Sequence, residues 1–348
     1  MCVCFDAIRT RLGVFFLIMW VGMWKWLVAA LALLTLVACR PEEGESRVVR
    51  IGCFPNITHV QALVARHMSR TGEGWFERYV PGYAVEWQTY NAGPSAAEAV
   101  FGRTVDLTYI GPSPAINAYA VSAGREMRLL AGAVNGGSAL MVRPGAGLAR
   151  AADFRGRSIA TPQLGNTQDV SCRAWLAAHG LSCTLEGGGD VRVAPTASSL
   201  QLQLMKQGKL DACWTVEPWV SLLEAGAGAK ALVQEPGVVT TVLAGRAAWL
   251  RAHPREAAAL LRAHRELTQW ILDHPEEAQR RVAEELAELT QTPVDPALVA
   301  SAWKRLTLTT EVDTGHLKQF VREAQAAGLL DRVPPIEGLL WSSLSPTP

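Results

Sequence analysis

The sequence lacks the features that several large classes of protein require. Its formal net charge is +1 over 348 residues, and it has no long run of one charge sign, which argues against a nucleic-acid partner. It contains no G-x-S-x-G, H-E-x-x-H, P-loop or Rossmann glycine pattern. None of its seven cysteines forms a C-x-x-C pair, so a metal site is not expected. We therefore expect no metal, no cofactor and no catalytic residue.

The composition allows a large hydrophobic core. About half of the residues are apolar (49%), and a chain of this length commonly divides into two lobes or domains. The predicted division has one lobe at 48–135 plus 236–348 and a second lobe at 136–235.

The first 38 residues have the pattern of a signal peptide. Lys25 precedes an unbroken apolar stretch, Trp26–Ala38, and the residues Leu36–Cys39 resemble the lipobox of bacterial lipoproteins. This resemblance implies that Cys39 is lipidated and that 39–47 is a polar tether. The alternative is a single transmembrane helix over Leu12–Val37. Translation from Met1, Met19 or Met23 also stays open.

Four cysteines follow Cys39 in the chain, at Cys53, Cys172, Cys183 and Cys213. An oxidising compartment would permit a disulfide, and Cys172 and Cys183 are the closest pair in sequence. The spacing does not decide whether they join.

From Val48 onward, apolar strand-like runs alternate with short polar loops and amphipathic helices. Such alternation is typical of β-α-β units and predicts an α/β fold with mainly parallel sheets. Capping-box patterns predict where the helices begin, and their first residues are Thr58, Ser95, Asn166 and Ser198. In "VDLTYIGPSPAINAY", Ser113 before Pro114 predicts another helix start.

An internal echo supports two lobes of similar design. "FGRTVDLTYIGPSPAI" and "KQGKLDACWTVEPWVSLL" share a glycine, a basic residue, an aspartate, an aromatic strand and a proline. Ala131–Gly145 and Gly237–Gly245 are predicted to cross between the lobes. After the second crossing, alanine- and leucine-rich helices interrupted by Pro254 and Pro275 predict a helical C-terminal part.

The segments "NAGPSAAEAV", "VDLTYIGPSPAINAY", "GNTQDVSCRAWL" and "LDACWTVEPW", together with the leader, resemble the type II periplasmic solute-binding proteins. The resemblance is to the branch that serves nitrate, sulfonate and taurine ABC importers, and it covers about 48–250. It implies two α/β lobes that close on a ligand in the cleft between them. It also implies an ABC permease and its ATPase as partners and a periplasmic location.

The predicted cleft loops contain no lysine or arginine. Helix N-termini and neutral donors would therefore hold the ligand, which favours a weakly basic anion such as a sulfonate. The predicted ligand contacts are Asn56, Thr58, His59, Ser95, Tyr109, Ser113, Asn166, Thr167, Ser198, Glu217 and Trp219.

Glu217 is the one acidic residue among these contacts. It is predicted either to bind the amine of a zwitterion such as taurine, with Tyr109 or Trp219 giving a cation–π contact, or to turn away toward backbone N–H groups. Asp106 and Asp211 are predicted to be structural.

These observations predict a lipid-anchored, monomeric solute-binding protein for an aliphatic sulfonate or a taurine-like compound. The alternatives are a binder of nitrate, bicarbonate or a thiamine-pyrimidine precursor and, more remotely, an enzyme on the same fold. For an enzyme, His59 with Ser95 or Ser113 is the only base and nucleophile combination that the fold could bring together.

Overall fold

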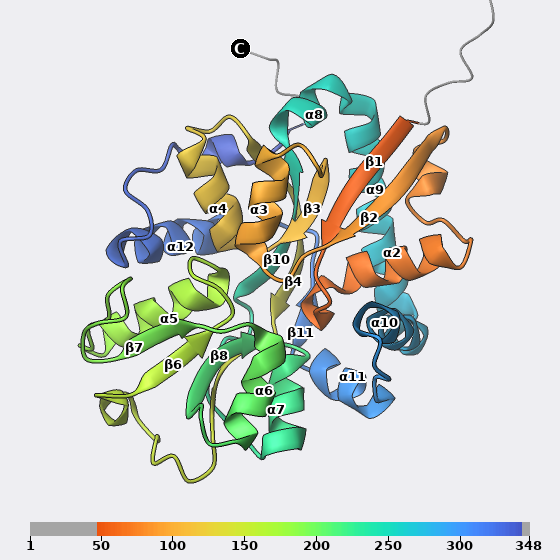
Figure 1. Ribbon diagram of the computed structural model, residues 1–348. Helices are drawn as coiled ribbons and strands as arrows, with labels where there is room; N and C mark the ends of the chain where they lie inside the picture. Colours follow the sequence, from red (N-terminus) through yellow and green to blue (C-terminus); the bar gives the residue numbers. More distant parts are fainter. Residues whose placement is uncertain (1–46, 343–348) are drawn as a thin grey trace, which may run out of the picture. The chain divides into compact units, whose positions relative to one another are not determined.

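The computed structural model describes residues 47–342, which form two β-sheets with helices packed against them (Figure 1). The predictions for the signal peptide, for Cys39 and for nearly all of the tether lie outside these residues. Within 47–342, no helix has the length and apolar character that crossing a membrane requires.

The larger sheet has six strands in the order β11-β4-β10-β3-β1-β2, and we call the part of the molecule built on it lobe 1. Parallel pairing joins β1 to β3, whereas β10 runs antiparallel to both β3 and β4. The strands are β1 (Arg47–Cys53), β2 (Tyr83–Thr89), β3 (Leu107–Ile110), β4 (Met127–Gly136), β10 (Val239–Arg246) and β11 (Leu306–Leu308). Its helices are η1 (Ile57–His59), α2 (Val60–Arg70), η2 (Glu77–Tyr79), α3 (Gly93–Phe101), α4 (Pro112–Val121), α8 (Ala247–Ala252), α9 (Pro254–Asp273), α10 (Pro275–Thr290), α11 (Pro296–Trp303), α12 (Thr314–Ala326) and η4 (Ile336–Leu339).

The smaller sheet has five strands in the order β7-β6-β8-β5-β9, and it forms lobe 2. β6 pairs in parallel with β7 and β8, and β5 runs antiparallel to β8 and β9. The strands are β5 (Ser138–Val142), β6 (Ser158–Thr161), β7 (Arg192–Pro195), β8 (Ala212–Val216) and β9 (Lys230–Gln234). The helices are η3 (Ala151–Phe154), α5 (Thr167–Ala178), α6 (Ser198–Lys206) and α7 (Trp219–Ala227).

Two segments connect the lobes. β4 passes into β5 through Gly136 and Gly137, whose positive φ angles of 81° and 73° suit glycine, and β9 returns to β10 over 235–238. The predicted two-lobed α/β architecture is confirmed. Both sheets are mixed, because the connecting strands β4, β5 and β10 run antiparallel to their neighbours.

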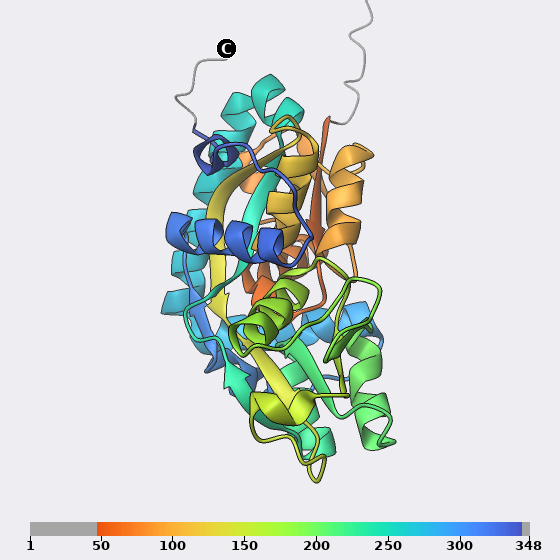
Figure 2. The same ribbon diagram turned by 90° about the vertical axis from the view of Figure 1, so that its left-hand side faces the viewer.

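Lobe 1 buries an apolar layer on each face of its sheet. One layer packs against α2, α9 and α10, and the other against α3, α4 and α12 (Figures 1 and 2). In lobe 2, α5 packs on one side of the sheet, and α6 and α7 pack on the other.

The helical C-terminal part is confirmed, and Pro254 and Pro275 interrupt it as predicted, each standing where one helix has ended and the next begins. Pro254 and Pro275 each occupy the first position of a helix, where their missing N–H costs no hydrogen bond. Before each proline, a histidine ring stacks on a tryptophan four residues earlier, as in the pairs Trp249–His253 and Trp270–His274.

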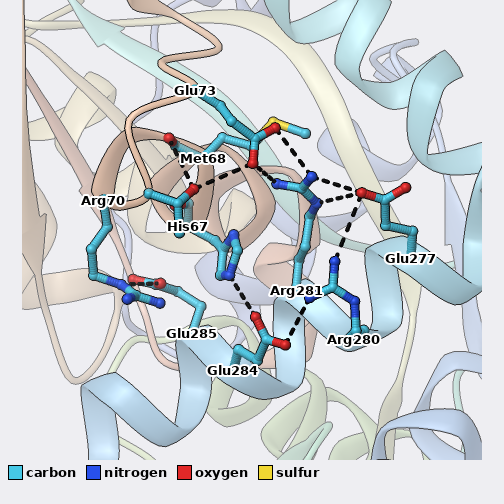
Figure 3. A network of polar contacts seen from close by, with 10 residues as sticks. His67, Met68, Arg70, Glu73, Glu277, Arg280, Arg281, Glu284 and Glu285 are labelled. Atoms are coloured by element: carbon cyan, nitrogen blue, oxygen red, sulfur yellow. Dashed lines mark hydrogen bonds and ion pairs between the residues drawn. The ribbon is translucent and has the colours of Figure 1, made fainter.

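A polar network fastens α10 to α2 (Figure 3). Glu285, which is fully buried, accepts hydrogen bonds from Arg66 at 2.8 Å and from Arg70 at 3.0 Å. Arg281 reaches the carboxylate of Glu73 at 2.6 Å and 3.1 Å. These contacts bring the C-terminal helices against a helix that lies more than two hundred residues earlier in the chain.

Candidate functional site

A pocket lies between the two lobes, with a volume of about 420 Å³ that includes space open to solvent at its mouth. Lobe 1 contributes the loops that follow β1, β2 and β3, and lobe 2 contributes the loops that follow β6 and β7 and the end of β8. The lining residues are Phe54, Asn56, Thr58, His59, Asn91, Ala92, Gly93, Gly111, Pro114, Pro162, Asn166, Thr167, Gln168, Ser198, Val216 and Thr240. None of them is a lysine, arginine, aspartate or glutamate.

The structure brings together six of the eleven predicted contacts in this lining. They are Asn56, Thr58, His59, Asn166, Thr167 and Ser198. The other five do not line it: Ser95, Tyr109, Ser113, Glu217 and Trp219.

Most of the predicted helix caps are wrong. α3 begins at Gly93, before Ser95, and α4 begins at Pro112, before Ser113. The residues that precede these helices are Ala92 and Gly111, which have no cap-forming side chain. Prolines fit the first turn of a helix, so each helix starts upstream of its serine.

The N-termini of α3, α4 and α6 have no side-chain cap. Their cap residues are Ala92, Gly111 and Ala197, and Ala92 and Gly111 line the pocket. Thr58 lies within η1 and likewise forms no cap. Uncapped first-turn N–H groups and the positive end of the helix dipole favour a bound anion.

Asn166 is the predicted cap that is confirmed. Its Oδ1 accepts a hydrogen bond from the backbone N–H of Asp169 at 2.9 Å. The Asp169 carboxylate is in turn held by Thr161 at 2.9 Å and Arg173 at 3.0 Å, all three being buried. This network fixes the start of α5 and with it the position of Thr167.

Three buried polar atoms at or beside the pocket have no hydrogen-bond partner. They are His59 Nδ1, Ser113 Oγ and Thr167 Oγ1. All three residues are at most 4% exposed. Buried polar atoms nearly always have partners, so these three atoms are candidates for contact with a bound ligand.

His59 is neutral at physiological pH. Burial lowers its pKa from 6.5 to about 3, and its ring lies 4.3 Å from that of Phe54, centroid to centroid. A neutral imidazole can still donate one hydrogen bond, but it offers an anion no full positive charge.

The lobes are in contact at two places near the pocket. Ser95 Oγ on α3 lies 3.5 Å from Gln163 Oε1 of lobe 2, and Trp219 Nε1 on α7 donates to Asn56 Oδ1 of lobe 1 at 3.1 Å. α12 also packs against both α4 and α5 (Figure 2). We call this arrangement, in which the two lobes are in contact, the closed form.

Tyr109 and Glu217 have other partners. The Tyr109 hydroxyl lies 2.9 Å from His264 Nδ1 in the core of lobe 1. Glu217 is fully buried and accepts hydrogen bonds from the Ser221 N–H at 3.1 Å and from Arg305 at 2.8 Å. Burial raises the pKa of Glu217, against the lowering effect of Ser221 and Arg305. This geometry matches the predicted alternative in which the carboxylate turns toward backbone N–H groups.

The two aspartates of the internal echo are structural, as predicted. Asp106 accepts from the Arg50 N–H and from Arg246, and Asp211 pairs with Arg143.

Cys172 and Cys183 are free thiols, as are Cys53 and Cys213. Within the described part of the chain, no group of histidine, cysteine, aspartate and glutamate residues could hold a metal ion.

Sequence reasoning missed ten of the lining residues, including Phe54, Pro162, Gln168 and Thr240. Phe54 and Pro162 lie in the loops after β1 and β6, and Gln168 lies in the first turn of α5. All three are near predicted contacts in the sequence, which was a usable signal. Thr240 lies on the returning strand β10, where no motif marks it.

Comparisons with known proteins agree with this fold. A Bacillus subtilis (strain 168) protein named for aliphatic sulfonate binding is 25% identical over 274 residues, 74% of this chain and 76% of the relative. The solved alkanesulfonate-binding protein of Xanthomonas axonopodis pv. citri, bound to MOPS, has a TM-score of 0.69 at 20% identity and covers 86% of this chain and 99% of its own. For the nitrate-binding protein of Synechocystis PCC 6803, the TM-score is 0.65 at 18% identity, with 82% and 83% covered.

These likenesses confirm the predicted resemblance to periplasmic solute-binding proteins of the sulfonate and nitrate branch. Because the family model matches residues 42–287, well over half of the sequence, the chain belongs to the NMT1-like family.

Proposed function

We propose that this protein is the periplasmic solute-binding component of an ABC importer and that its ligand is a small organic anion, an aliphatic sulfonate in particular. The relatives named for sulfonate binding support the class of ligand. The partners are the permease and its ATPase, and the binding unit is a monomer. The proposal assigns no catalytic residue.

The observation that carries this proposal is an uncharged pocket with unpartnered donors. His59 Nδ1 and Thr167 Oγ1 are buried without partners, and two pocket helices begin without caps. Neutral donors in a site of low dielectric can hold a single negative charge through several hydrogen bonds. Sulfonic acids are strong acids and their anions are weak bases, so a sulfonate stays ionised and accepts such bonds without needing a cation.

Apolar surface favours an alkyl tail over nitrate or bicarbonate. Phe54, Pro114, Pro162 and Val216 line the same pocket as the polar donors. A bare inorganic anion would leave this surface uncovered, whereas a short alkyl chain would bury it at about 25 cal/mol per Å².

The residues proposed to contact the ligand are predicted contacts that line the pocket, together with Ser113 beside it. Asn56, Thr58, His59, Thr167 and Ser198 contact the ligand directly. Asn166 contacts it or orders α5, and Ser113 donates its free hydroxyl at the start of α4. The predicted contacts Ser95 and Trp219 act through the closed form instead, since both touch the opposite lobe. We place Tyr109 and Glu217 outside the set.

The anchor is a separate part of the proposal. Cleavage before Cys39 followed by its lipidation would tie the protein to the membrane and leave 39–47 as the tether. Mass spectrometry of the mature N-terminal peptide tests this, and an unmodified Cys39 would remove the anchor but not the binding function.

Titration calorimetry tests the binding function. The probes are methanesulfonate, ethanesulfonate, MOPS and taurine, compared with nitrate, bicarbonate and a hydroxymethylpyrimidine. We expect saturable one-site binding of an alkanesulfonate and weaker or no binding of the inorganic anions. Tight binding of nitrate or of the pyrimidine with none of the sulfonates would contradict the proposed ligand.

A further inference from the structure

At Gly111 the two lobes approach each other closely beside the pocket. It is the cap residue of α4 in lobe 1, and Thr167 at the start of α5 in lobe 2 faces it. A Cβ added to Gly111 would lie less than 3.0 Å from Thr167 Oγ1. The nearest atom of its own lobe, Pro114 Cδ, would be 3.5 Å away, an ordinary contact.

The backbone of Gly111 does not itself require glycine. Its φ of −67° and ψ of 151° are open to any L-amino acid. The missing side chain therefore matters for the space between the lobes and not for the conformation of the turn.

Thr167 gains no protein hydrogen bond from this approach. Its Oγ1 is buried and unpartnered, although the hydroxyl lies against the uncapped start of α4. Burying a hydroxyl without a partner is unfavourable, so the approach has to be stabilised by something that binds there.

We propose that Gly111 is the residue that permits full closure, so that the Thr167 hydroxyl from lobe 2 and the N-terminus of α4 from lobe 1 bind the same anionic group. The inference rests on the proposed function. It makes Gly111 a positioning residue that contributes no donor side chain of its own, and it makes the Gly111–Thr167 contact the steric limit of closure.

Two other glycines supply controls. At Gly102, φ is −72° and an added Cβ would meet nothing closer than 3.4 Å, so Gly102→Ala introduces the same change away from the pocket. At Gly93, an added Cβ would lie less than 3.0 Å from Pro114 of the same lobe. Gly93→Ala should therefore lower thermal stability, whereas Gly111→Ala should not do so in the absence of ligand.

The first experiment is calorimetry with methanesulfonate and MOPS. We expect Gly111→Ala to raise Kd roughly 5- to 150-fold, because overpacking disfavours the closed state and lowers the competent fraction. Gly102→Ala should bind like the wild type. Gly111→Ala/Thr167→Ala should bind as Thr167→Ala does, because the second change removes the clashing oxygen. A Gly111→Ala protein that binds like the wild type, or a double variant in which the two losses add, would overturn the inference.

A second experiment measures closure without any ligand. Ser95→Cys and Gln163→Cys place one thiol on each lobe at positions whose side chains are in contact, and the disulfide yield under a glutathione redox buffer reports relative changes in the closed fraction. Gly111→Ala should lower this yield, and Thr167→Ala should restore it. If the disulfide yield changes in this way but no anion binds in calorimetry, the proposed function fails and the role of Gly111 in closure stands. A yield that Gly111→Ala leaves unchanged would overturn the role of Gly111.

Discussion

The α2–α10 contact and the pocket between the lobes differ in how their buried polar groups are paired. At the α2–α10 contact, buried Glu285 meets Arg66 and Arg70, and the hydrogen bond from Arg281 lowers the pKa of Glu73 (Figure 3). In the pocket there is no charged side chain, and donors are buried without partners. In the first region the buried carboxylate of Glu285 has its cationic partners within the chain, whereas in the second His59 Nδ1 and Thr167 Oγ1 have no partner within the chain.

Because of this difference, we expect the α2–α10 contact to contribute to the free energy of folding and the pocket to contribute to ligand affinity. A buried charge that loses its partner costs several kcal/mol of folding free energy. A donor that already lacks a partner costs the fold nothing more when it is removed, but it takes affinity away. Variants in the two regions should therefore affect different measurements.

The largest expected effect is on the α2–α10 contact. Arg66→Ala/Arg70→Ala leaves the Glu285 carboxylate buried without a cation and should lower the free energy of unfolding by about 3–5 kcal/mol. Denaturant unfolding measures this, with Arg262→Ala on the exposed face of α9 as the control. Affinity for methanesulfonate should be unchanged in whatever fraction stays folded. A stability change below about 1 kcal/mol would mean that these ion pairs do not hold the helices together.

Acid should weaken the fold through two buried histidines. The pKa of His59 is lowered to about 3 and that of His264 to about 4, from 6.5, by burial. The unfolded chain takes up protons below pH 6.5 and the folded chain does not, so stability falls as pH falls from 6.5. Each histidine should contribute about 2 kcal/mol of loss between pH 7 and pH 5.

The same acid should leave sulfonate affinity unchanged, since neither the ligand nor folded His59 titrates in that interval. Urea midpoints and calorimetry at pH 7 and pH 5 measure the two quantities. His264→Gln should remove about half of the pH dependence of stability. Affinity that rises steadily toward pH 5 would mean that His59 is protonated when the ligand binds.

Removing an unpartnered donor should act on binding alone. Thr167→Ala is expected to weaken sulfonate binding by about 1–3 kcal/mol, because a ligand oxygen loses its hydrogen bond. Thermal stability without ligand should be unchanged or slightly higher, because a buried hydroxyl without a partner disappears. Thr161→Ala, which removes a partner of buried Asp169, is the contrasting variant and should lower stability. Unchanged calorimetric affinity for Thr167→Ala would remove this hydroxyl from the site.

The smallest expected effect is a difference between ligands. Glu217→Gln should change the affinities for taurine and for ethanesulfonate by the same factor, because the carboxylate bonds to Ser221 and Arg305 and not to an amine. Calorimetry with the two ligands measures the ratio. A loss confined to taurine would restore Glu217 as an amine-binding group.

The alternation of strands and helices was sufficient to predict two α/β lobes and the helical C-terminal part. It did not predict the strand directions, because antiparallel pairing of β4 with β10 depends on how the chain returns from lobe 2. The α2–α10 network could not be predicted from the sequence either, because Arg66 and Glu285 are far apart in the chain and only the fold brings them together.

The site was predictable at the level of loops but not of individual side chains. Thr167 and His59 lie in the pocket as the loop positions implied, and Asn166 caps α5. Ser95 and Ser113 were assigned as caps because serine is a strong cap former, but the neighbouring prolines let the helices start earlier. Tyr109 was misleading because strand residues alternate between faces, and its side chain points into the core of lobe 1.

The central claim is that the pocket binds an anion without a charged side chain. Its most direct test is a crystal structure of the protein with MOPS or methanesulfonate bound. The sulfonate oxygens should lie about 2.7–3.2 Å from Thr167 Oγ1, from His59 Nδ1 and from first-turn N–H groups of α4, with no lysine or arginine in contact. A sulfonate held instead by a cationic side chain, or bound elsewhere while the pocket keeps its unpartnered donors, would contradict the assignment.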